Sequence, residues 1–239
     1  MIGPIYRLTV RALLVQKRTL MLALIALAPV LTSLIFALAR DPGADRHDFY
    51  STIVQQLFVP TVAALVALVF GVSAFGDERE DGTILYLVAT PQPRVELVVA
   101  KVAAAWTATL VLLVPSLVLS GLLALGGQAS VRLIAWPLLG VILSGLAYCA
   151  VSSWLSLMTR RPVVIGIMYI LLWEGSIATF AASAAKLSIS AYGRAFVAHA
   201  LPQAAKPVAG TVASAVILAA VAAIAVAAAS RRLVTAELP

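Results

Sequence analysis

The sequence contains little charge and almost no cysteine or histidine. Asp, Glu, Lys and Arg make up 11% of the 239 residues, against about 25% in ordinary soluble domains. Apolar residues make up 62%, and a soluble fold of this length has no room to hide so much apolar surface. The composition therefore predicts an integral membrane protein with one compact domain, residues 1–239. Cys149 is the single cysteine, which excludes a disulfide within the chain and gives no indication of a thiol metal cluster.

Sequence features for nucleotide hydrolysis and for catalysis are also missing. No Gly-Lys pair occurs, so the chain lacks the G-x-x-x-x-G-K-S/T loop that cradles ATP phosphates. The apolar runs contain no His pair, no Asp pair and no Gly-x-Ser-x-Gly turn, so we expect no catalytic residue and no metal site. The net charge of +7 is scattered between apolar runs, which favours basic residues at the cytoplasmic ends of membrane spans over nucleic-acid binding.

Six apolar stretches are long enough to cross a bilayer as helices, since about twenty residues at 1.5 Å each span the hydrocarbon core. They are Leu20–Ala39, Thr52–Phe75, Val102–Gly126, Leu133–Met158, Val163–Ala181 and Val208–Ala229. The sequence therefore predicts an all-α membrane protein with six transmembrane helices. Four prolines fall inside these stretches and predict kinks rather than breaks. They are Pro29, Pro60, Pro115 and Pro137.

Two further segments flank the predicted spans without crossing. Residues 1–19 include Ile5–Arg18, where leucines alternate with basic residues, which is typical of an interfacial helix on the inner leaflet. Residues 182–207 are too polar to span and predict short helices on the outer face. A signal peptide is the alternative for the first span, but Leu20–Ala39 is longer than the usual 7–15 apolar residues.

The distribution of basic residues predicts the orientation. With six spans, eleven Lys and Arg lie on the side of both termini and six on the other side. The first group is Arg7, Arg11, Lys17, Arg18, Arg79, Arg94, Lys101, Arg160, Arg161, Arg231 and Arg232. The positive-inside rule therefore predicts that both termini face the cytoplasm of a cell whose inner or plasma membrane holds the chain.

Residues 76–101, between the second and third predicted spans, hold half of the ten acidic residues. Four acids precede Gly82, an apolar stretch follows, and Pro91 and Pro93 stop the helix before Arg94 begins the next one. This pattern fits a short amphipathic helix on the inner membrane face, which buries apolar side chains against the bundle or a partner. A solvated charged loop is the alternative reading.

The same segment resembles the intracellular segment of type-2 ABC exporter permeases, with the pattern E-x-E-x-G-T-L-E-x-L-L-x-T-P-x-S-R-x-E-x-x-x-G-K. The matching positions, without a gap, are Glu78, Glu80, Gly82, Thr83, Leu87, Thr90, Pro91, Arg94, Glu96 and Lys101. The departures are Leu85 for a glutamate, Pro93 for a serine and Ala100 for a glycine. Loss of the glutamate removes one polar contact that a partner would use.

The resemblance implies a coupling helix that docks on a separate ATP-hydrolysing subunit. It implies a docking surface of Glu78, Glu80, Asp81, Gly82 and Thr83, with Pro91 and Lys101 in the same coupling segment. It also implies that Arg94 and Glu96 set the angle at which the third span re-enters the membrane. ATP and Mg would bind the partner subunit, and this chain would carry no cofactor. A second permease copy or a paralogue would complete the transporter.

The expected function is therefore ATP-driven export through a membrane permease, and the short outer loops favour a hydrophobic or amphipathic substrate. Two alternative functions are consistent with parts of the same sequence evidence. One is an ATP-coupled membrane subunit that transmits force or assists assembly without exporting anything. The other is an unrelated membrane enzyme or scaffold.

Glu174 is an ionisable residue inside a predicted span. A carboxylate at membrane depth costs a few kcal/mol or more, about 3 on insertion scales, so it is expected to face the bundle interior or a wet cavity. One interpretation is a residue on the substrate path that contacts a cationic group. The other is a protonated or hydrogen-bonded structural acid, or one near the outer interface.

Overall fold

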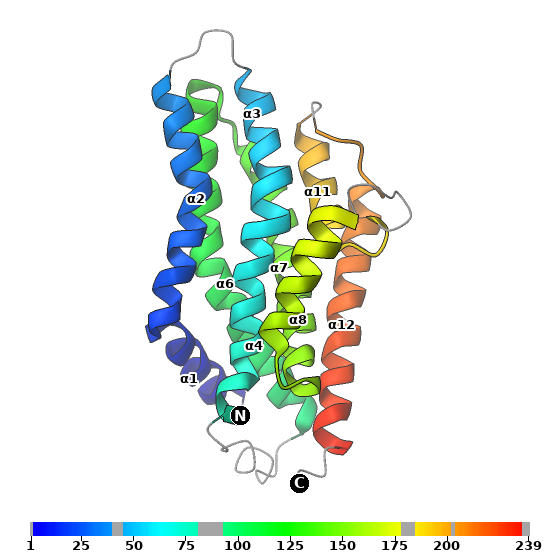
Figure 1. Cartoon of the computed structure of the whole chain (residues 1–239). Helices are drawn as coiled ribbons and strands as arrows, with labels where there is room; N and C mark the ends of the chain where they lie inside the picture. Colours follow the sequence, from blue (N-terminus) through cyan, green and yellow to red (C-terminus); the bar gives the residue numbers. More distant parts are fainter. Residues whose placement is uncertain (1, 40–44, 81–92, 178–184, 202–203, 236–239) are drawn as a thin grey trace.

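The computed structural model describes residues 2–39, 45–80, 93–177, 185–201 and 204–235. Every regular element in these ranges is helical (Figure 1). In chain order they are α1 (Ile2–Val15), α2 (Lys17–Ala39), α3 (Arg46–Thr52), η1 (Ile53–Ala63), α4 (Ala64–Glu80), α6 (Arg94–Leu125), η2 (Gly126–Gln128), α7 (Val131–Met158), α8 (Pro162–Met168), η3 (Tyr169–Ile177), α11 (Ile189–Ala200) and α12 (Thr211–Thr235). The all-α prediction is confirmed over this part of the chain.

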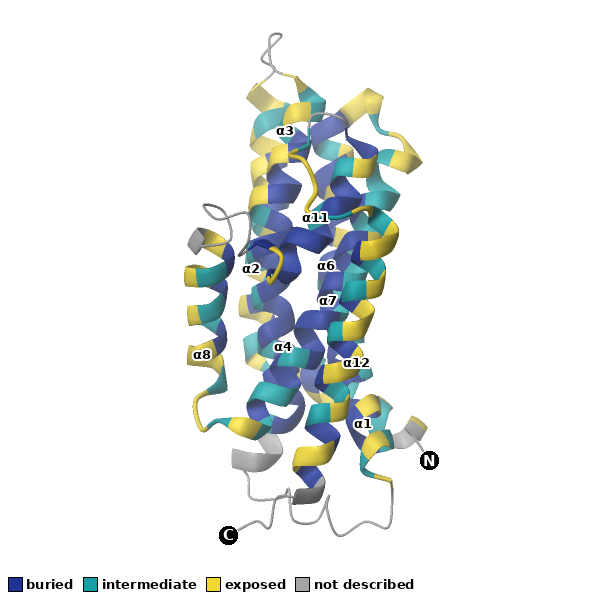
Figure 2. Cartoon of the chain, turned by 90° about the vertical axis from the view of Figure 1, so that its right-hand side faces the viewer, coloured by how far each residue is buried: buried dark blue, intermediate teal, exposed yellow. Residues whose placement is uncertain are grey.

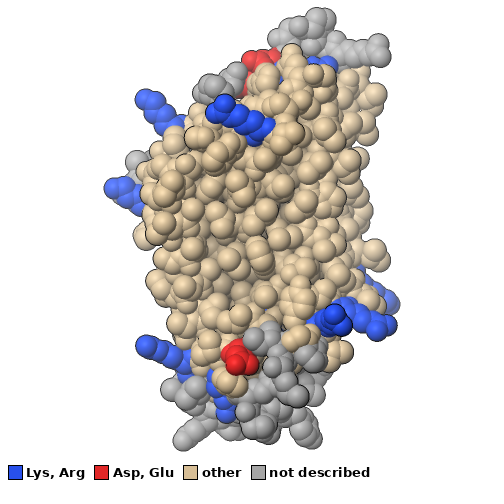
Figure 3. All heavy atoms as spheres, turned by 180° about the vertical axis from the view of Figure 1, so that it is seen from behind, with Lys and Arg blue, Asp and Glu red and all other residues tan. Residues whose placement is uncertain are grey.

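Five helices are long and apolar enough to cross a membrane. They are Lys17–Ala39, Arg46–Gly76, Arg94–Gln128, Val131–Met158 and Thr211–Leu233. Each matches one predicted span. Figure 3 shows why this shape suits a bilayer, since Lys and Arg gather toward the two ends and leave an uncharged belt between them. The chain is a multi-pass membrane protein.

The remaining predicted span, Val163–Ala181, corresponds to α8 and η3, which together run from Pro162 to Ile177. The apolar helix counted from Pro162 to Gly175 is shorter than the other five, and residues 178–184 lie outside the described ranges. A sixth crossing at this place stays a prediction.

Close packing of α4 on α7 forms the centre of the bundle. Gly71 of α4 allows this approach, because an added Cβ would lie 2.8 Å from the carbonyl oxygen of Cys149 and 2.7 Å from Cβ of Ser152. The Ser153 hydroxyl donates a hydrogen bond to the Gly71 carbonyl at 3.0 Å. Small residues of this kind let membrane helices approach where no hydrophobic effect drives them together.

Substitution of Gly71 by valine should therefore destabilise the bundle. The new side chain must displace backbone atoms of α7, and overpacking of this kind costs about 1–3 kcal/mol. We expect the thermal unfolding midpoint of the purified protein in detergent to fall by several degrees. Gly127→Val is the matched control, because a Cβ at Gly127 meets nothing within 4 Å. Equal midpoints for the two variants would contradict this account of the α4–α7 contact.

Two N-terminal helices pack along α6. The Ser116 hydroxyl of α6 donates to the Ala26 carbonyl of α2, and the hydroxyls of Tyr6 and Thr107 are hydrogen-bonded at 2.9 Å. Helix α1 ends at Val15, and it lies at the end of the bundle where both chain termini are found (Figure 1). Helix α1 lies within residues 1–19, and an interfacial helix at this place stays a prediction.

The helices continue through all four of the interior prolines, as the sequence predicts. Pro60 lies within η1, which has the wider π-helical geometry. A proline has no N–H to donate, and a local π adjustment is one way in which a membrane helix accommodates that loss.

The outer-face location predicted for residues 182–207 stays a prediction. Helix α11, which belongs to that segment, has most of its residues buried in the bundle. It packs against α7, α12 and η1, and Figure 2 shows it among buried segments. Gly140 of α7 makes this contact possible, since a Cβ there would lie 2.6 Å from the carbonyl oxygen of Gly193. The small and aromatic residues of α11 therefore pack against the bundle.

Candidate functional site

The predicted coupling segment lies between α4 and α6. Helix α4 extends through Glu80, so Glu78 and Glu80 belong to its last turn. Residues 81–92, which include Asp81, Gly82, Thr83 and Pro91, lie outside the described ranges. The two helix ends that carry the segment are at the same end of the bundle as α1 and both termini (Figure 1).

The start of α6 agrees with the proline stop predicted from the sequence. Pro93 is the N-cap, and its carbonyl accepts from the backbone N–H of Glu96 at 3.0 Å. Glu96 lies in the first turn, where a carboxylate is stabilised by the positive end of the helix dipole. Arg94 is half-buried, and its Nη1 has no hydrogen-bond partner within the described part of the chain. These two residues therefore stand at the point where α6 enters the bundle.

Lys101, about two turns after Arg94 in α6, connects α6 with α4. Its side chain is 1% exposed, and Nζ donates to the Ala74 carbonyl of α4 at 2.6 Å. The same ammonium lies 4.9 Å from the centroid of the Phe75 ring, within the range of a cation–π interaction. Lys101, the last residue of the matched motif, therefore links α6 to α4.

Glu174 is the most heavily hydrogen-bonded acid in the described part of the chain, and it is 1% exposed. Its Oε1 accepts from the Tyr169 hydroxyl at 3.0 Å and from the Ile189 N–H at 3.0 Å. Its Oε2 accepts from the Ser188 hydroxyl at 2.5 Å, from the Ser190 hydroxyl, and from the Ser190 N–H at 3.3 Å. Both carboxylate oxygens are therefore engaged by neighbouring groups of the protein.

These contacts make Glu174 a cap for the N-terminus of α11. The first backbone N–H groups of a helix have no partner within the helix, and a carboxylate beside them is further stabilised by the helix dipole. Ser188 is the N-cap residue, and its hydroxyl accepts from the Ala191 N–H at 3.1 Å. The geometry agrees with the interpretation of Glu174 as a hydrogen-bonded structural acid, and a contact with substrate stays a prediction.

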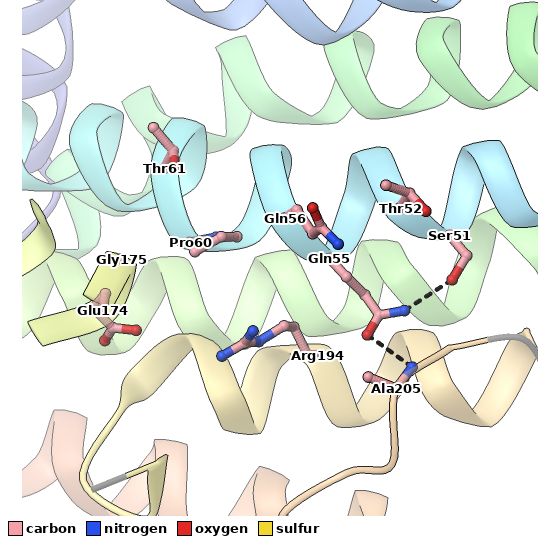
Figure 4. Close-up of a pocket in the computed structure, with 10 residues that line it drawn as sticks. All are labelled: Ser51, Thr52, Gln55, Gln56, Pro60, Thr61, Glu174, Gly175, Arg194 and Ala205. Atoms are coloured by element: carbon pink, nitrogen blue, oxygen red, sulfur yellow. Dashed lines mark hydrogen bonds between the residues drawn. The ribbon is translucent and has the colours of Figure 1, made fainter. Parts of the chain in front are cut away.

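A polar cavity of about 610 Å³ opens beside this cap (Figure 4). Hydroxyl and amide side chains from one long helix line it: Ser51, Thr52, Gln55, Gln56 and Thr61. Glu174 and Arg194 line it from η3 and α11. The Gln55 amide donates to the Ser51 hydroxyl at 2.8 Å and accepts from the Ala205 N–H at 3.2 Å, which fixes this wall of the cavity.

The chain matches the ABC-2 family transporter protein family over residues 16–182. It belongs to that family. The match includes the acidic segment between α4 and α6, and it confirms the resemblance to type-2 ABC permeases. No curated protein matches the chain significantly.

The ABC-2 match ends before α11, so the cavity is built from both sides of that boundary. Glu174 lies within the matched residues, whereas Arg194 and Ala205 follow them. The structure thus brings Glu174 together with residues that the sequence analysis did not single out. The one available signal was the Ser188-Ile189-Ser190 run before a helical stretch, a typical N-cap pattern. Nothing in the sequence showed which acid would lie beside it.

Proposed function

We propose that this ABC-2 family chain is the permease subunit of an ATP-driven exporter that moves a hydrophobic or amphipathic substrate out of the cytoplasm or the inner leaflet. The observation that carries the proposal is the gapless motif from Glu78 to Lys101, together with membership of the family. Family membership implies association with an ABC ATPase and with the bilayer. In this proposal the chain is not itself an enzyme, and ATP and Mg bind the separate ATPase.

The topology that we propose has six crossings with both termini in the cytoplasm of the cell, and α8 with η3 forms the fifth crossing. The excess of Lys and Arg on the side of the termini supports this orientation. It is also supported by the shared location of α1, the C-terminal end of α4 and the start of α6 at one end of the bundle (Figure 1).

Force transmission follows from how the coupling segment is held. Motion of a docked ATPase would act on the last turn of α4 and on the first turn of α6. The buried Lys101 bond to the Ala74 carbonyl ties these helices together, and α4 also packs extensively on α7. A push at the segment would therefore tilt several helices as one body. A second copy or a paralogue would supply the other half of the transport path.

The proposal is tested by co-expression of the full chain with candidate ABC ATPases from the same genome. We expect the two proteins to purify together and to release a fluorescent anionic phospholipid from one leaflet of proteoliposomes only with Mg-ATP. Absence of any bound ATPase would contradict the permease assignment. A stable complex that hydrolyses ATP and moves no amphiphile would favour the alternative in which the subunit transmits force without export.

A further inference from the structure

We propose that the polar cavity beside α11 binds the anionic headgroup, phosphate or carboxylate, of an amphiphile, with Arg194 as the cation that recognises it. This inference rests on the proposed transport function and names the substrate class of the cavity. It reverses the electrostatic sense of one of the two sequence-based interpretations, in which Glu174 would contact a cationic group.

The carboxylate of Glu174 already has hydrogen-bond partners within the protein. Glu174 lines the cavity, but its two oxygens already accept hydrogen bonds from two backbone N–H groups and two serine hydroxyls at the start of α11, and from the Tyr169 hydroxyl of η3. A cationic ligand would have to compete with these donors. The side chain of Glu174 is therefore occupied in holding the start of α11 and is not available to a ligand.

Arg194, in contrast to Glu174, has few hydrogen-bond partners among the described residues. Its only hydrogen bond to the described residues is a long one, from Nη2 to the Ser190 hydroxyl at 3.4 Å, and it forms no ion pair within that part of the chain. Figure 4 shows its side chain extending from α11 with the guanidinium directed toward the side of the cavity where Glu174 lies. A half-buried guanidinium is costly without a partner. Its planar set of donors fits a carboxylate or a phosphate in a bidentate manner.

Neutral hydrogen-bonding groups complete the headgroup site. Gln56 and Thr52 lie one turn apart on η1 and α3 and are both exposed. The Gln56 amide makes no hydrogen bond with the described residues, so its donors are available to a bound oxyanion. The cavity of about 610 Å³ has the size of a typical ligand pocket, which ranges from about 300 to 1,000 Å³.

An apolar cavity on the other side of the cap supports an amphiphile over a soluble anion. This second cavity, of about 340 Å³, is lined almost entirely by apolar residues that include Leu68, Ile165 and Ile170. Tyr169 and Ile189, which hydrogen-bond to Glu174, belong to its wall. The Glu174 network thus separates a polar cavity from an apolar one. A molecule with a charged head and a hydrocarbon tail matches this pair.

The test measures binding of short-chain lipids to the full permease–ATPase complex in detergent. The probes are dioctanoyl phosphatidylglycerol, dioctanoyl phosphatidylcholine and inorganic phosphate. We expect the anionic lipid to bind at least about ten-fold more tightly than the zwitterionic one, and Arg194→Gln to abolish that difference, since a charge-assisted hydrogen bond is lost. Arg194→Lys should retain part of it. Arg132→Gln is the matched control, because Arg132 is exposed at the start of α7 and does not line the cavity.

A preference that survives in Arg194→Gln, or that is absent from the wild type, would overturn the proposal. Equal binding of phosphate and the anionic lipid would overturn the amphiphile assignment. If Arg194→Gln does not fold, Gln56→Leu replaces it, with a several-fold weaker binding of the anionic lipid as the expected result. Binding needs no ATP, so loss of transport with intact lipid preference contradicts the proposed function alone. Intact transport without the preference contradicts this inference alone.

Discussion

Reversal of charge at Glu78 and Glu80 (Glu78→Lys with Glu80→Lys) should release the ATPase from the permease while leaving the permease in the membrane. Both residues lie in the last turn of α4, in the segment proposed to dock on the ATPase. Placing like charges at a docking surface costs several kcal/mol, which corresponds to at least about a hundred-fold loss of affinity. Co-purification of the tagged permease with its ATPase, followed by titration of the purified subunits, measures this loss.

The same substitutions should not disturb insertion, because added lysines on the cytoplasmic side agree with the positive-inside rule. Glu237→Lys, in the C-terminal tail, is the control for a charge reversal on the same side outside the coupling segment. If the double variant retains the ATPase as firmly as the wild type does, these carboxylates take no part in docking, and the coupling role of the segment is lost.

Substitution of Glu174 by alanine should destabilise the part of the bundle around α11 by about 3 kcal/mol or more. The change leaves two backbone N–H groups and the hydroxyls of Tyr169, Ser188 and Ser190 without their buried acceptor. Each unsatisfied buried donor costs about 1–3 kcal/mol. The thermal midpoint of the purified protein should fall by roughly 6 °C or more, and hydrogen exchange should show loss of protection in α11 first.

The isosteric change Glu174→Gln separates a structural role from a role in substrate contact. The amide keeps one acceptor but turns an N–H₂ toward donors, so a smaller loss of stability is expected. Ser116→Ala is a control with one lost hydrogen bond, since its hydroxyl bonds the Ala26 carbonyl far from α11. A Glu174→Gln variant with wild-type stability would contradict the capping role. If that variant also had an unchanged transport rate and substrate range, no substrate-path role would remain for Glu174.

Several parts of this fold were predictable because one physical quantity governs each. Bilayer thickness sets the length of an apolar run, and five of the predicted spans match helices long enough to cross. Proline chemistry ends the coupling segment, and α6 begins directly after Pro93 as expected. The family was predictable from the spacing of Glu78, Gly82, Pro91 and Lys101, since such a pattern carries positional information that composition lacks.

The packing of residues 189–200 was not predictable in the same way. Their mild amphipathicity suits a helix at a rim as well as one packed in the bundle. The difference depends on whether α7 presents a gap, and Gly140 supplies one opposite Gly193. Whether the fifth predicted span crosses the bilayer also depends on how η3 continues beyond Ile177, and hydropathy alone measures only the length of its apolar run.

The amino-acid sequence by itself determined that this protein is helical, lies in a membrane and belongs with ABC-2 permeases, because run length, helix stops and motif spacing are properties of neighbouring residues. Only the tertiary structure decided what the ionisable groups near α11 do. It placed Glu174 against the N-terminus of α11 and Gln55 against Ala205, 150 positions away. The reason is physical: the roles of a buried carboxylate and of a guanidinium depend on which donors and acceptors surround them, and helix packing brings those groups together from distant parts of the chain.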